Sequence, residues 1–207
     1  KRQMLYISSS EVYGSKITED SFEESQFGSI DINSIRSSYS ESKRASEVLC
    51  KAYSSEYNVD TVIVRPGHIY GPTASPKDKR VSSDFSYRAA QGKVLEMKSL
   101  GLQKRSYCYS LDCAAAILIV LINGEKGVSY NIGHDEVTSI REMAQIIAEA
   151  GNVILKIKEP TEDDLKQFNP MNNSSLNNEK IKAIGYRDSF SVQEGLMHTV
   201  EILKELS

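Results

Sequence analysis

The sequence predicts an α/β fold built on a parallel sheet, and three observations lead to this prediction. The short apolar segment QMLYI at residues 3–7 runs into three serines, which indicates a buried strand with hydroxyl groups at its carboxyl end. A long segment follows in which apolar residues recur at helical spacing, at Ala45, Val48, Leu49, Ala52 and Tyr53. A second run rich in β-branched residues, VDTVIV at 59–64, indicates another buried strand. Strand, helix and strand in this order form a βαβ unit, whose crossover requires parallel strands.

The remaining elements follow from the same patterns. A polar loop is expected over residues 16–37, above the end of the first strand, and a Pro/Asn-rich link over 159–175. Short strands are expected near Val94 and Ser106 and over 127–132 and 153–157. Helices are expected at 83–91, 111–121, 139–150, 177–184 and 192–206. The apolar run CAAAILIVLI at 113–122 is too short to span a bilayer, so we expect a buried helix there.

Composition narrows the class of partner. With 25 basic and 28 acidic residues and no long run of one sign, neither nucleic acid nor a membrane surface is an expected partner. The three cysteines, Cys50, Cys108 and Cys113, are odd in number and lack metal-ligand spacing. We therefore expect no metal site and a reducing, cytoplasmic location. No signal-peptide pattern opens the sequence.

Tyr39 and Lys43 are the first candidate catalytic residues. Residues four apart lie on one ridge of a helix, so the two side chains can meet. An ammonium group close to a phenol favours the phenolate, which can then act as a base. Ser9 or Ser10 can supply a hydroxyl that holds a substrate alcohol while its hydride moves to a nicotinamide ring. Y-x-x-x-K is a short motif, however, and among eleven tyrosines a chance match is unsurprising.

Six ordered motifs strengthen this interpretation. They are SSSEVYG at 8–14, YSESK at 39–43, VRPGHIYGP at 64–72, QKRSYCYSLDCAAAI at 103–117, SYNIG at 129–133 and IKAIGYRDSFSVQEGL at 181–196. In these motifs the chain resembles the extended short-chain dehydrogenase/reductase family, specifically its NAD-dependent nucleotide-sugar epimerases, dehydratases and decarboxylases. Among them, the decarboxylase-like members are the most similar. The resemblance covers essentially the whole chain and implies a Rossmann-like, doubly wound parallel sheet with a small α+β substrate-binding lobe.

The resemblance also implies roles for individual residues. Ser9 matches the catalytic Ser/Thr, with Ser10 and Glu11 in the next two places and a possible slip of one position. Tyr39 matches the catalytic base, and Lys43 matches the residue that binds the nicotinamide ribose and promotes ionisation of the tyrosine. The cofactor-binding residues implied are Ser8, Tyr39, Lys43, Pro66 and Gly67.

The substrate-binding residues implied are His68, Arg80, Asp84, Lys98 and Arg105. Arg105 matches an arginine that commonly holds the diphosphate, and its planar fork suits that task. His68 stands where many relatives carry asparagine. Asp84 stands where decarboxylase-like members often carry asparagine, and its charge would repel a phosphate unless it is paired.

One feature of the family is missing from the sequence. None of the twelve glycines falls into G-x-G-x-x-G or G-x-x-G-x-x-G, the turn that lets a pyrophosphate approach a helix N-terminus. We therefore expect the chain to be the C-terminal part of a longer protein, without the first strands of the sheet, and to be inactive alone. Residues 1–72 would complete the NAD-binding domain, and 73–207 would form mainly the substrate lobe, with about 106–123 returning to the sheet.

Two functions from different classes remain open. The favoured one is an NAD-dependent nucleotide-sugar epimerase/dehydratase that oxidises the sugar transiently at C4. The alternative is a non-catalytic nucleotide-sugar-binding or dimerising module that lacks a dinucleotide site. A homodimer through the helix bearing Tyr39 and Lys43 is expected in either case. The resemblance implies a slight preference for dehydration or decarboxylation over epimerisation, because the family's dehydratases and decarboxylases carry a carboxylate that moves a proton on the sugar ring at positions similar to that of Glu11. The sequence leaves open which nucleotide and which sugar are bound, which reaction follows the oxidation, and whether the cofactor is NAD or NADP.

Overall fold

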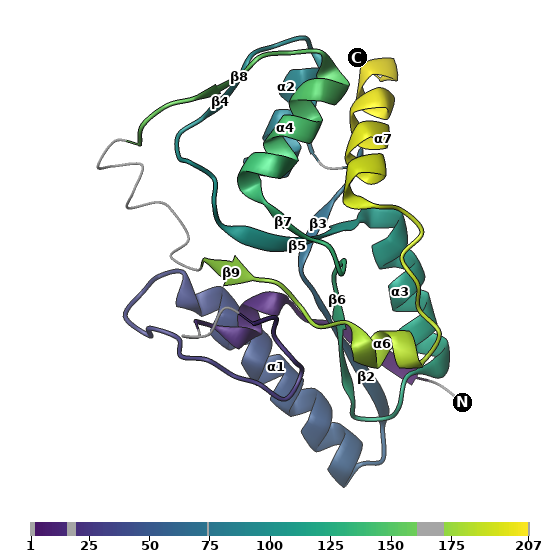
Figure 1. Cartoon of the computed structure of the whole chain (residues 1–207). Coiled ribbons are helices and arrows are strands. Elements are labelled where there is room, and N and C mark those ends of the chain that lie inside the picture. The colour runs from purple at the N-terminus through teal and green to yellow at the C-terminus, as the bar shows by residue number, and fades with distance from the viewer. Residues whose placement is uncertain (1–2, 16–19, 74, 161–171, 207) are drawn as a thin grey trace.

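A three-stranded parallel sheet forms the centre of the half of the molecule that carries the N-terminus. The computed structural model describes residues 3–15, 20–73, 75–160 and 172–206. The strands, in sheet order, are β1 (Gln3–Ile7), β2 (Asp60–Pro66) and β6 (Ser129–Ile132). Helices α1 (Ser37–Glu56) and α3 (Ser110–Asn123) lie on opposite sides of this sheet (Figure 1). The predicted βαβ unit, β1 to α1 to β2, is confirmed with parallel pairing in which Gln3 faces Asp60.

A second set of strands continues from the end of β2. It comprises β3 (His68–Tyr70), β5 (Lys104–Tyr109), β7 (Val137–Ser139) and β9 (Asn173–Ser174), all connected through β5. A separate parallel pair consists of β4 (Leu95–Met97) and β8 (Leu155–Ile157). Strands β3, β7 and β9 were not predicted, because each has only two or three residues and shows too little periodicity.

Three helices pack together in the half of the molecule that carries the C-terminus. They are α2 (Val81–Ala90), α4 (Ile140–Gly151) and α7 (Val192–Glu205), and all three were predicted (Figure 1). A short helix, α6 (Glu179–Ala183), precedes α7, and a 3₁₀ turn, η1 (Ser10–Tyr13), follows β1. No described helix is long and apolar enough to cross a bilayer.

The hydrophobic core divides into two main clusters. One lies between α2, α4, α7 and β5 and includes Phe85, Met143, Ile147 and Leu196. The other lies around β2, β6 and α3 and includes Val62, Val64, Ala116, Ile132 and Ile181. Because Ile181 belongs to the second cluster, α6 packs against the parallel sheet. Strand β6 also joins the parallel sheet, although we expected only about 106–123 to return to it. The boundary at residue 72 stays a prediction.

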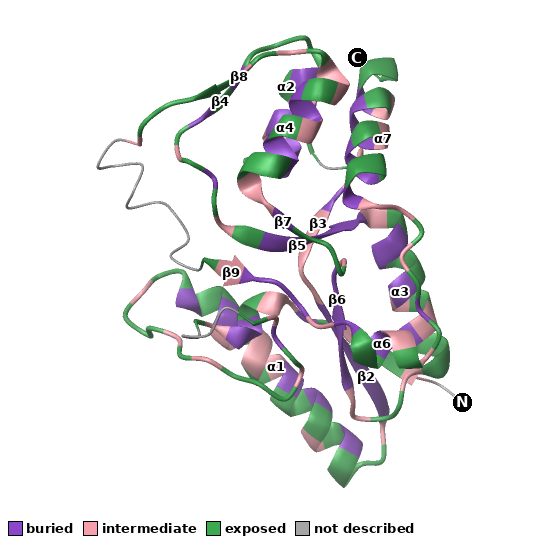
Figure 2. Ribbon diagram, in the orientation of Figure 1, coloured by how far each residue is buried: buried purple, intermediate pink, exposed green. Residues whose placement is uncertain are grey.

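The apolar faces of α1 and α3 are not where the sequence pattern places them. On α1, Val48 and Leu49 are 65% and 59% exposed, whereas Glu47 and Cys50 are buried. On α3, Leu118 and Ile122 are also exposed, so this helix is only half buried, as the alternating colours of Figure 2 show. The periodicity located a real apolar stripe on α1, but that stripe faces outward in this chain.

Most of the Pro/Asn-rich link lies outside the described residues, as does part of the predicted loop at 16–37. The described end of the link forms β9, which pairs with β5 through Arg105 and Ser174.

Candidate functional site

Lys43 links α1 to the end of the first strand. Its ammonium Nζ donates a hydrogen bond of 2.9 Å to the carbonyl oxygen of Ile7, the last residue of β1. The same Nζ lies 5.8 Å from the centre of the Tyr39 ring and 5.1 Å from that of Tyr6. Tyr39 is 50% exposed and therefore reachable from solvent. The structure thus places the Tyr/Lys pair beside the segment that carries the serines.

The three serines that follow β1 lie in three different environments. Ser8 is buried, and its hydroxyl has no hydrogen-bond partner among the described residues. Ser9 is the N-cap of η1, and its Oγ accepts a hydrogen bond of 3.2 Å from the backbone N–H of Glu11. Ser10 and Glu11 open η1 and face a cavity. The cap therefore fixes how the backbone turns from the strand toward that cavity.

A hydroxyl-rich cavity of about 160 Å³ lies against η1 and the start of α1. It contains two of the predicted catalytic residues, Ser10 and Glu11, and one predicted substrate residue, His68. The other lining residues come from the predicted loop, the start of α1 and β9: Gly14, Ser15, Ser29, Ile30, Asp31, Ser34, Arg36, Ser37, Ser40 and Ser174. Ser9, Tyr39 and Lys43 do not line this cavity, although they lie on the elements that form it.

His68 is held as a neutral imidazole. Burial, together with the nearby cations of Arg105 and Arg80, lowers the pKa of His68 to about 4. One ring nitrogen, Nε2, lies 3.2 Å from the hydroxyl of Ser174, and the ring is tilted against Tyr107. At neutral pH His68 can therefore offer one donor or one acceptor to a ligand, but no charge.

Arg105 lies on β5, is buried and does not line the cavity. Burial lowers the pKa of Arg105, and the nearby Tyr107 hydroxyl and Glu11 carboxylate oppose that shift. One guanidinium nitrogen donates to the carbonyl oxygen of Lys104 at 2.8 Å. The side chain is within electrostatic reach of both Glu11 and His68.

The other predicted substrate residues lie further away. Arg80 donates to the carboxylate of Asp78 at 2.8 Å through Nε, and this bond, with others, lowers the pKa of Asp78 to about 2. Asp84 forms an ion pair of 3.2 Å with Arg88, one turn along α2, which removes part of the repulsion expected toward a phosphate. Lys98 follows β4 and is exposed. None of the three lines the cavity, and their roles stay predictions.

The chain holds residues that fit one end of a dinucleotide. The unpartnered hydroxyl of Ser8 and the ammonium of Lys43 lie at the carboxyl end of β1, where open α/β sheets bind ligands. Pro66 and Gly67 end β2 beside them, and the N–H of Gly67 is held by the carbonyl oxygen of Ile132 at 2.8 Å. These residues suit a nicotinamide and its ribose. The turn that would hold a pyrophosphate is absent from this sequence.

Most of the cavity residues were not predicted as site residues, and two of them, Arg36 and Ser174, are informative. Arg36 immediately precedes α1 and, among the described residues, has no hydrogen bond or ion pair. Ser174 reaches the cavity only because β9 pairs with β5, across a large sequence separation. In the sequence, Arg36 precedes Tyr39 by three positions, which is almost one helical turn. That spacing is a usable signal, whereas nothing in the sequence signals Ser174.

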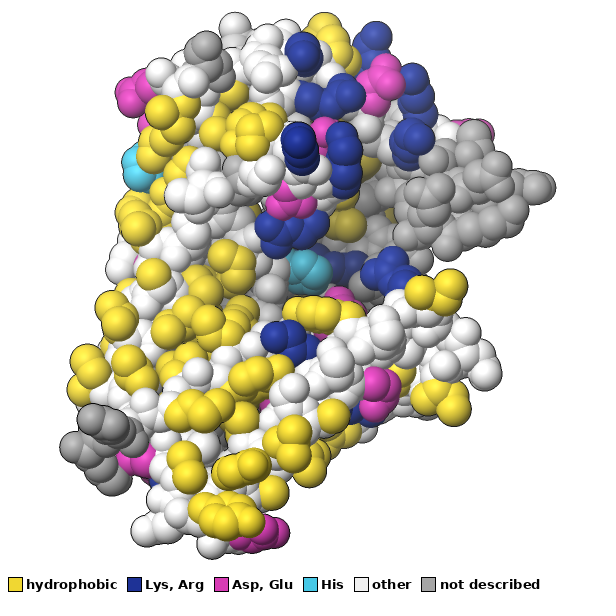
Figure 3. All heavy atoms as spheres, turned by 180° about the vertical axis from the view of Figure 1, so that it is seen from behind, with side chains coloured by type: hydrophobic (Ala, Val, Ile, Leu, Met, Phe, Trp, Pro, Cys, Tyr) yellow, Lys and Arg dark blue, Asp and Glu magenta, His cyan; other side chains and the backbone are white. Residues whose placement is uncertain are grey.

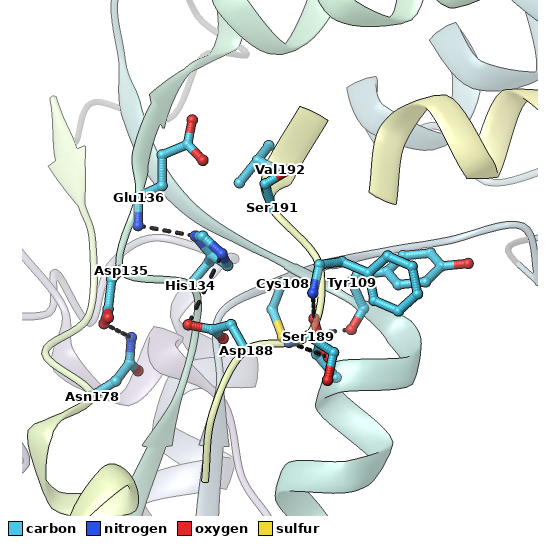
Figure 4. A network of polar contacts seen from close by, with 12 residues as sticks. Cys108, Tyr109, His134, Asp135, Glu136, Asn178, Asp188, Ser189, Ser191 and Val192 are labelled. Atoms are coloured by element: carbon cyan, nitrogen blue, oxygen red, sulfur yellow. Dashed lines mark hydrogen bonds and ion pairs between the residues drawn. The ribbon is translucent and has the colours of Figure 1, made fainter. Parts of the chain in front are cut away.

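A second polar network lies outside the cavity (Figure 4). His134 Nε2 is 3.9 Å from the carboxylate of Asp188, and the Asn178 amide donates to Asp135 at 3.3 Å. Lys182 also pairs with Asp135. These contacts join the loop after β6 to α6 and the segment before α7, so we interpret the network as structural, although the buried Oδ1 of Asn178 has no hydrogen-bond partner among the described residues. No group of three or more His, Cys, Asp or Glu side chains within the described ranges is placed to hold a metal ion.

The surface around these elements is uneven in composition. Figure 3 shows Lys and Arg side chains gathered around a hollow in the upper half of one face, with hydrophobic side chains spread over the lower half. The exposed apolar residues include Met4 and Ile7 of β1 and Val48, Leu49 and Tyr53 of α1.

Comparison with known proteins gives a consistent result. A family model described as the NAD dependent epimerase/dehydratase family matches residues 1–133. The chain is 32% identical over 196 residues to UDP-glucuronic acid decarboxylase 3 of Arabidopsis thaliana, covering 94% of this chain and 55% of that protein. It is 30% identical over 207 residues to the dTDP-D-glucose 4,6-dehydratase of Mus musculus, covering 96% and 55%. The chain thus spans about half the length of these curated relatives.

Solved structures agree. The UDP-glucose 4-epimerase of Thermus thermophilus, in complex with NAD, superposes with a TM-score of 0.81 and 26% identity, over 99% of this chain and 65% of that one. The dTDP-glucose 4,6-dehydratase of Bacillus anthracis, in complex with NAD, superposes with a TM-score of 0.80 and 25% identity, over 98% and 62%. The Rossmann-like fold predicted from the sequence is confirmed.

Proposed function

Because this chain belongs to the NAD-dependent epimerase/dehydratase family, we propose that it carries the catalytic groups of an enzyme that oxidises a nucleotide-diphosphate sugar transiently at C4. The observation that supports this most directly is the hydrogen bond from Lys43 Nζ to the carbonyl oxygen of Ile7. It holds the Tyr39 helix against the strand end from which Ser8, Ser9 and Ser10 emerge. Since the chain spans about half of its curated relatives, the activity is proposed for the protein that contains it.

In this proposal each catalytic side chain has one task. The Tyr39 phenolate accepts the proton of the sugar C4 hydroxyl, and the Lys43 ammonium stabilises that phenolate. Ser9 donates a hydrogen bond to the same sugar oxygen as it becomes a ketone. A bound NAD would supply the acceptor for the hydride that leaves C4. Ser8, Pro66 and Gly67 orient the nicotinamide end of the cofactor beside these groups.

Glu11 directs the step after the oxidation. A ketone at C4 acidifies the protons on the adjacent ring carbons, and the exposed Glu11 carboxylate lies in the cavity where it can accept one of them. His68 and Ser174 provide uncharged hydrogen-bonding groups in the same cavity, and Arg105 provides a positive charge near His68 for a diphosphate. This set favours dehydration or decarboxylation over simple epimerisation.

We also propose that the protein forms a homodimer through α1. Val48, Leu49 and Tyr53 form an outward apolar stripe on this helix, and two such stripes can bury each other around a two-fold axis. Leu49→Asp should convert the dimer to a monomer in sedimentation equilibrium, while Glu56→Asp at the polar end of the helix should not. A wild-type protein that is monomeric at micromolar concentration would contradict the proposal.

The enzymatic proposal is tested with Tyr39→Phe in the full-length protein. Removing the phenol oxygen should reduce turnover of the preferred substrate by about 10²–10⁴-fold, because general-base catalysis contributes a factor of this size. The assay is NAD-supported conversion of UDP-glucuronic acid, UDP-glucose and dTDP-glucose, followed by product chromatography. Tyr57→Phe, just after the same helix and also exposed, is the matched control and should be fully active. Wild-type turnover in Tyr39→Phe would favour the non-catalytic binding module.

A further inference from the structure

Arg65 is the largest fully buried side chain of the described residues, and each of its three guanidinium nitrogens donates a hydrogen bond. Its Nε and Nη2 donate to the two carboxylate oxygens of Glu47 at 2.9 and 2.6 Å, a bidentate fork. Its Nη1 donates to the Tyr13 hydroxyl at 3.0 Å and to the carbonyl oxygen of Glu24 at 2.9 Å. The guanidinium also stacks over the Tyr13 ring, 5.0 Å from its centre. One side chain of β2 thus holds α1, η1 and the loop after η1.

The partners of Arg65 belong to the elements that carry the proposed catalytic residues. Glu47 lies one helical turn after Lys43 and two turns after Tyr39, on the same ridge of α1. Tyr13 is the last residue of η1, two positions after Glu11, and its hydroxyl donates to Asn131 of β6 at 2.5 Å. The network therefore connects the catalytic helix to the catalytic turn through the centre of the parallel sheet.

Arg65 and Tyr13 both keep their protons in this network. Burial alone would lower the pKa of Arg65, but its bonds to Glu47 and the neighbouring Tyr13 raise it above the usual value. Burial raises the pKa of Tyr13, so its hydroxyl keeps the proton that it donates to Asn131. Both groups can therefore act as hydrogen-bond donors in the network.

A buried ion pair adds little stability compared with an apolar pair of the same volume, because both charges must be desolvated. What a bidentate fork provides instead is one defined orientation, since sliding or rotation of α1 would break two parallel hydrogen bonds at once. Arg44 secures the same interface nearer the surface, with Nε donating to the carbonyl oxygen of Val12 at 2.7 Å. Together, the buried contacts of Arg65 and the more exposed contact of Arg44 allow α1 only one register against η1.

We propose that Arg65 and Glu47 are positioning residues that set the register of α1 against η1, and so the distance between Tyr39 and the Ser9 to Glu11 turn. This proposal rests on the proposed function of those residues. Both side chains are buried and direct their polar atoms at each other and at neighbouring protein groups, so neither acts on the substrate directly.

The decisive variant is the double substitution Glu47→Met with Arg65→Met, which replaces the ion pair by apolar groups of similar size and should fold. In the full-length protein with NAD and its preferred nucleotide sugar, we expect kcat to fall at least tenfold while KM changes less than threefold. Without any substrate, amide hydrogen exchange at Val12 and Gly14 in and after η1 should rise at least tenfold. Arg65→Lys keeps the charge but loses the fork, so it should show the same two effects even if the double variant fails to fold.

Asp112→Asn is the matched control. Its carboxylate is equally buried and accepts hydrogen bonds from the backbone N–H groups of Ser189 and Phe190, but it contacts neither α1 nor η1. This variant should be less stable, with kcat and η1 exchange unchanged. Wild-type kcat and wild-type η1 exchange in the double variant and in Arg65→Lys would overturn the proposal. The exchange readout needs no substrate, so it separates this failure from a failure of the enzymatic assignment, which Tyr39→Phe reports.

Discussion

The neutral state of His68 predicts a specific dependence of stability on pH. The unfolded chain protonates this histidine near its ordinary pKa of about 6.5, whereas burial and the cations of Arg105 and Arg80 lower the folded pKa of His68 to about 4. Between these values the unfolded state binds more protons, so the free energy of unfolding rises with pH through this window. At about 1.4 kcal/mol per unit, the contribution approaches about 3 kcal/mol above pH 6.5 and is lost as the pH falls toward 4.

Urea denaturation of wild type and His68→Asn at intervals from pH 4 to pH 7.5 measures this contribution. The difference between the two proteins isolates His68 from the carboxylates that titrate in the same range. We expect the difference to change by about 2–3 kcal/mol across the window, with wild type losing more stability at low pH. His198→Asn, in which the His68 environment is unchanged, should keep the wild-type dependence. Parallel curves for wild type and His68→Asn would refute the argument that His68 is neutral because of its surroundings.

Three further predictions concern the lobe formed by α2, α4 and α7. Ser139→Ala removes the capping box at the start of α4, in which Ser139 and Glu142 bond reciprocally, and should lower the free energy of unfolding by about 1 kcal/mol in a urea titration. Ile147→Ala, in the fully buried face of α4, should cost about 2–5 kcal/mol by the same measurement, because it leaves a cavity. Gly195→Ala would press a methyl group into the Tyr70 hydroxyl, so the melting temperature should fall although alanine favours a helix.

Elements with strong local signals were predictable from the sequence. Helix α4 shows why: Met143 and Ile147 lie at helical spacing, Ser139 and Glu142 form a capping box, and both signals agree with the packing found. Strand β2 was equally clear, since four consecutive β-branched residues, 61–64, precede Arg65. In such segments the local preference and the tertiary environment favour the same conformation.

Parts of the candidate site depend on pairing between distant segments and carry no local signal. Ser174 reaches the cavity through the parallel pairing of β9 with β5, about seventy positions away in the chain. The contact between Lys43 and Ile7 likewise depends on how α1 packs against β1. The motifs identified Tyr39 and Lys43 as chemical candidates, but only the fold shows where they lie relative to the strand end.

Helix α1 shows how a polar side chain can invert a sequence pattern. The rule that the apolar stripe of a helix faces the core assumes that the polar residues have no partner inside. Here Arg65 supplies that partner to Glu47 from the adjacent strand, so the polar ridge can turn inward and Val48 and Leu49 turn out. The ion pair that we propose to set the register of the catalytic helix thereby also exposes the apolar surface through which we propose that two copies associate. Loss of the pair should therefore disturb the interior alignment of α1 and the presentation of its outer stripe together.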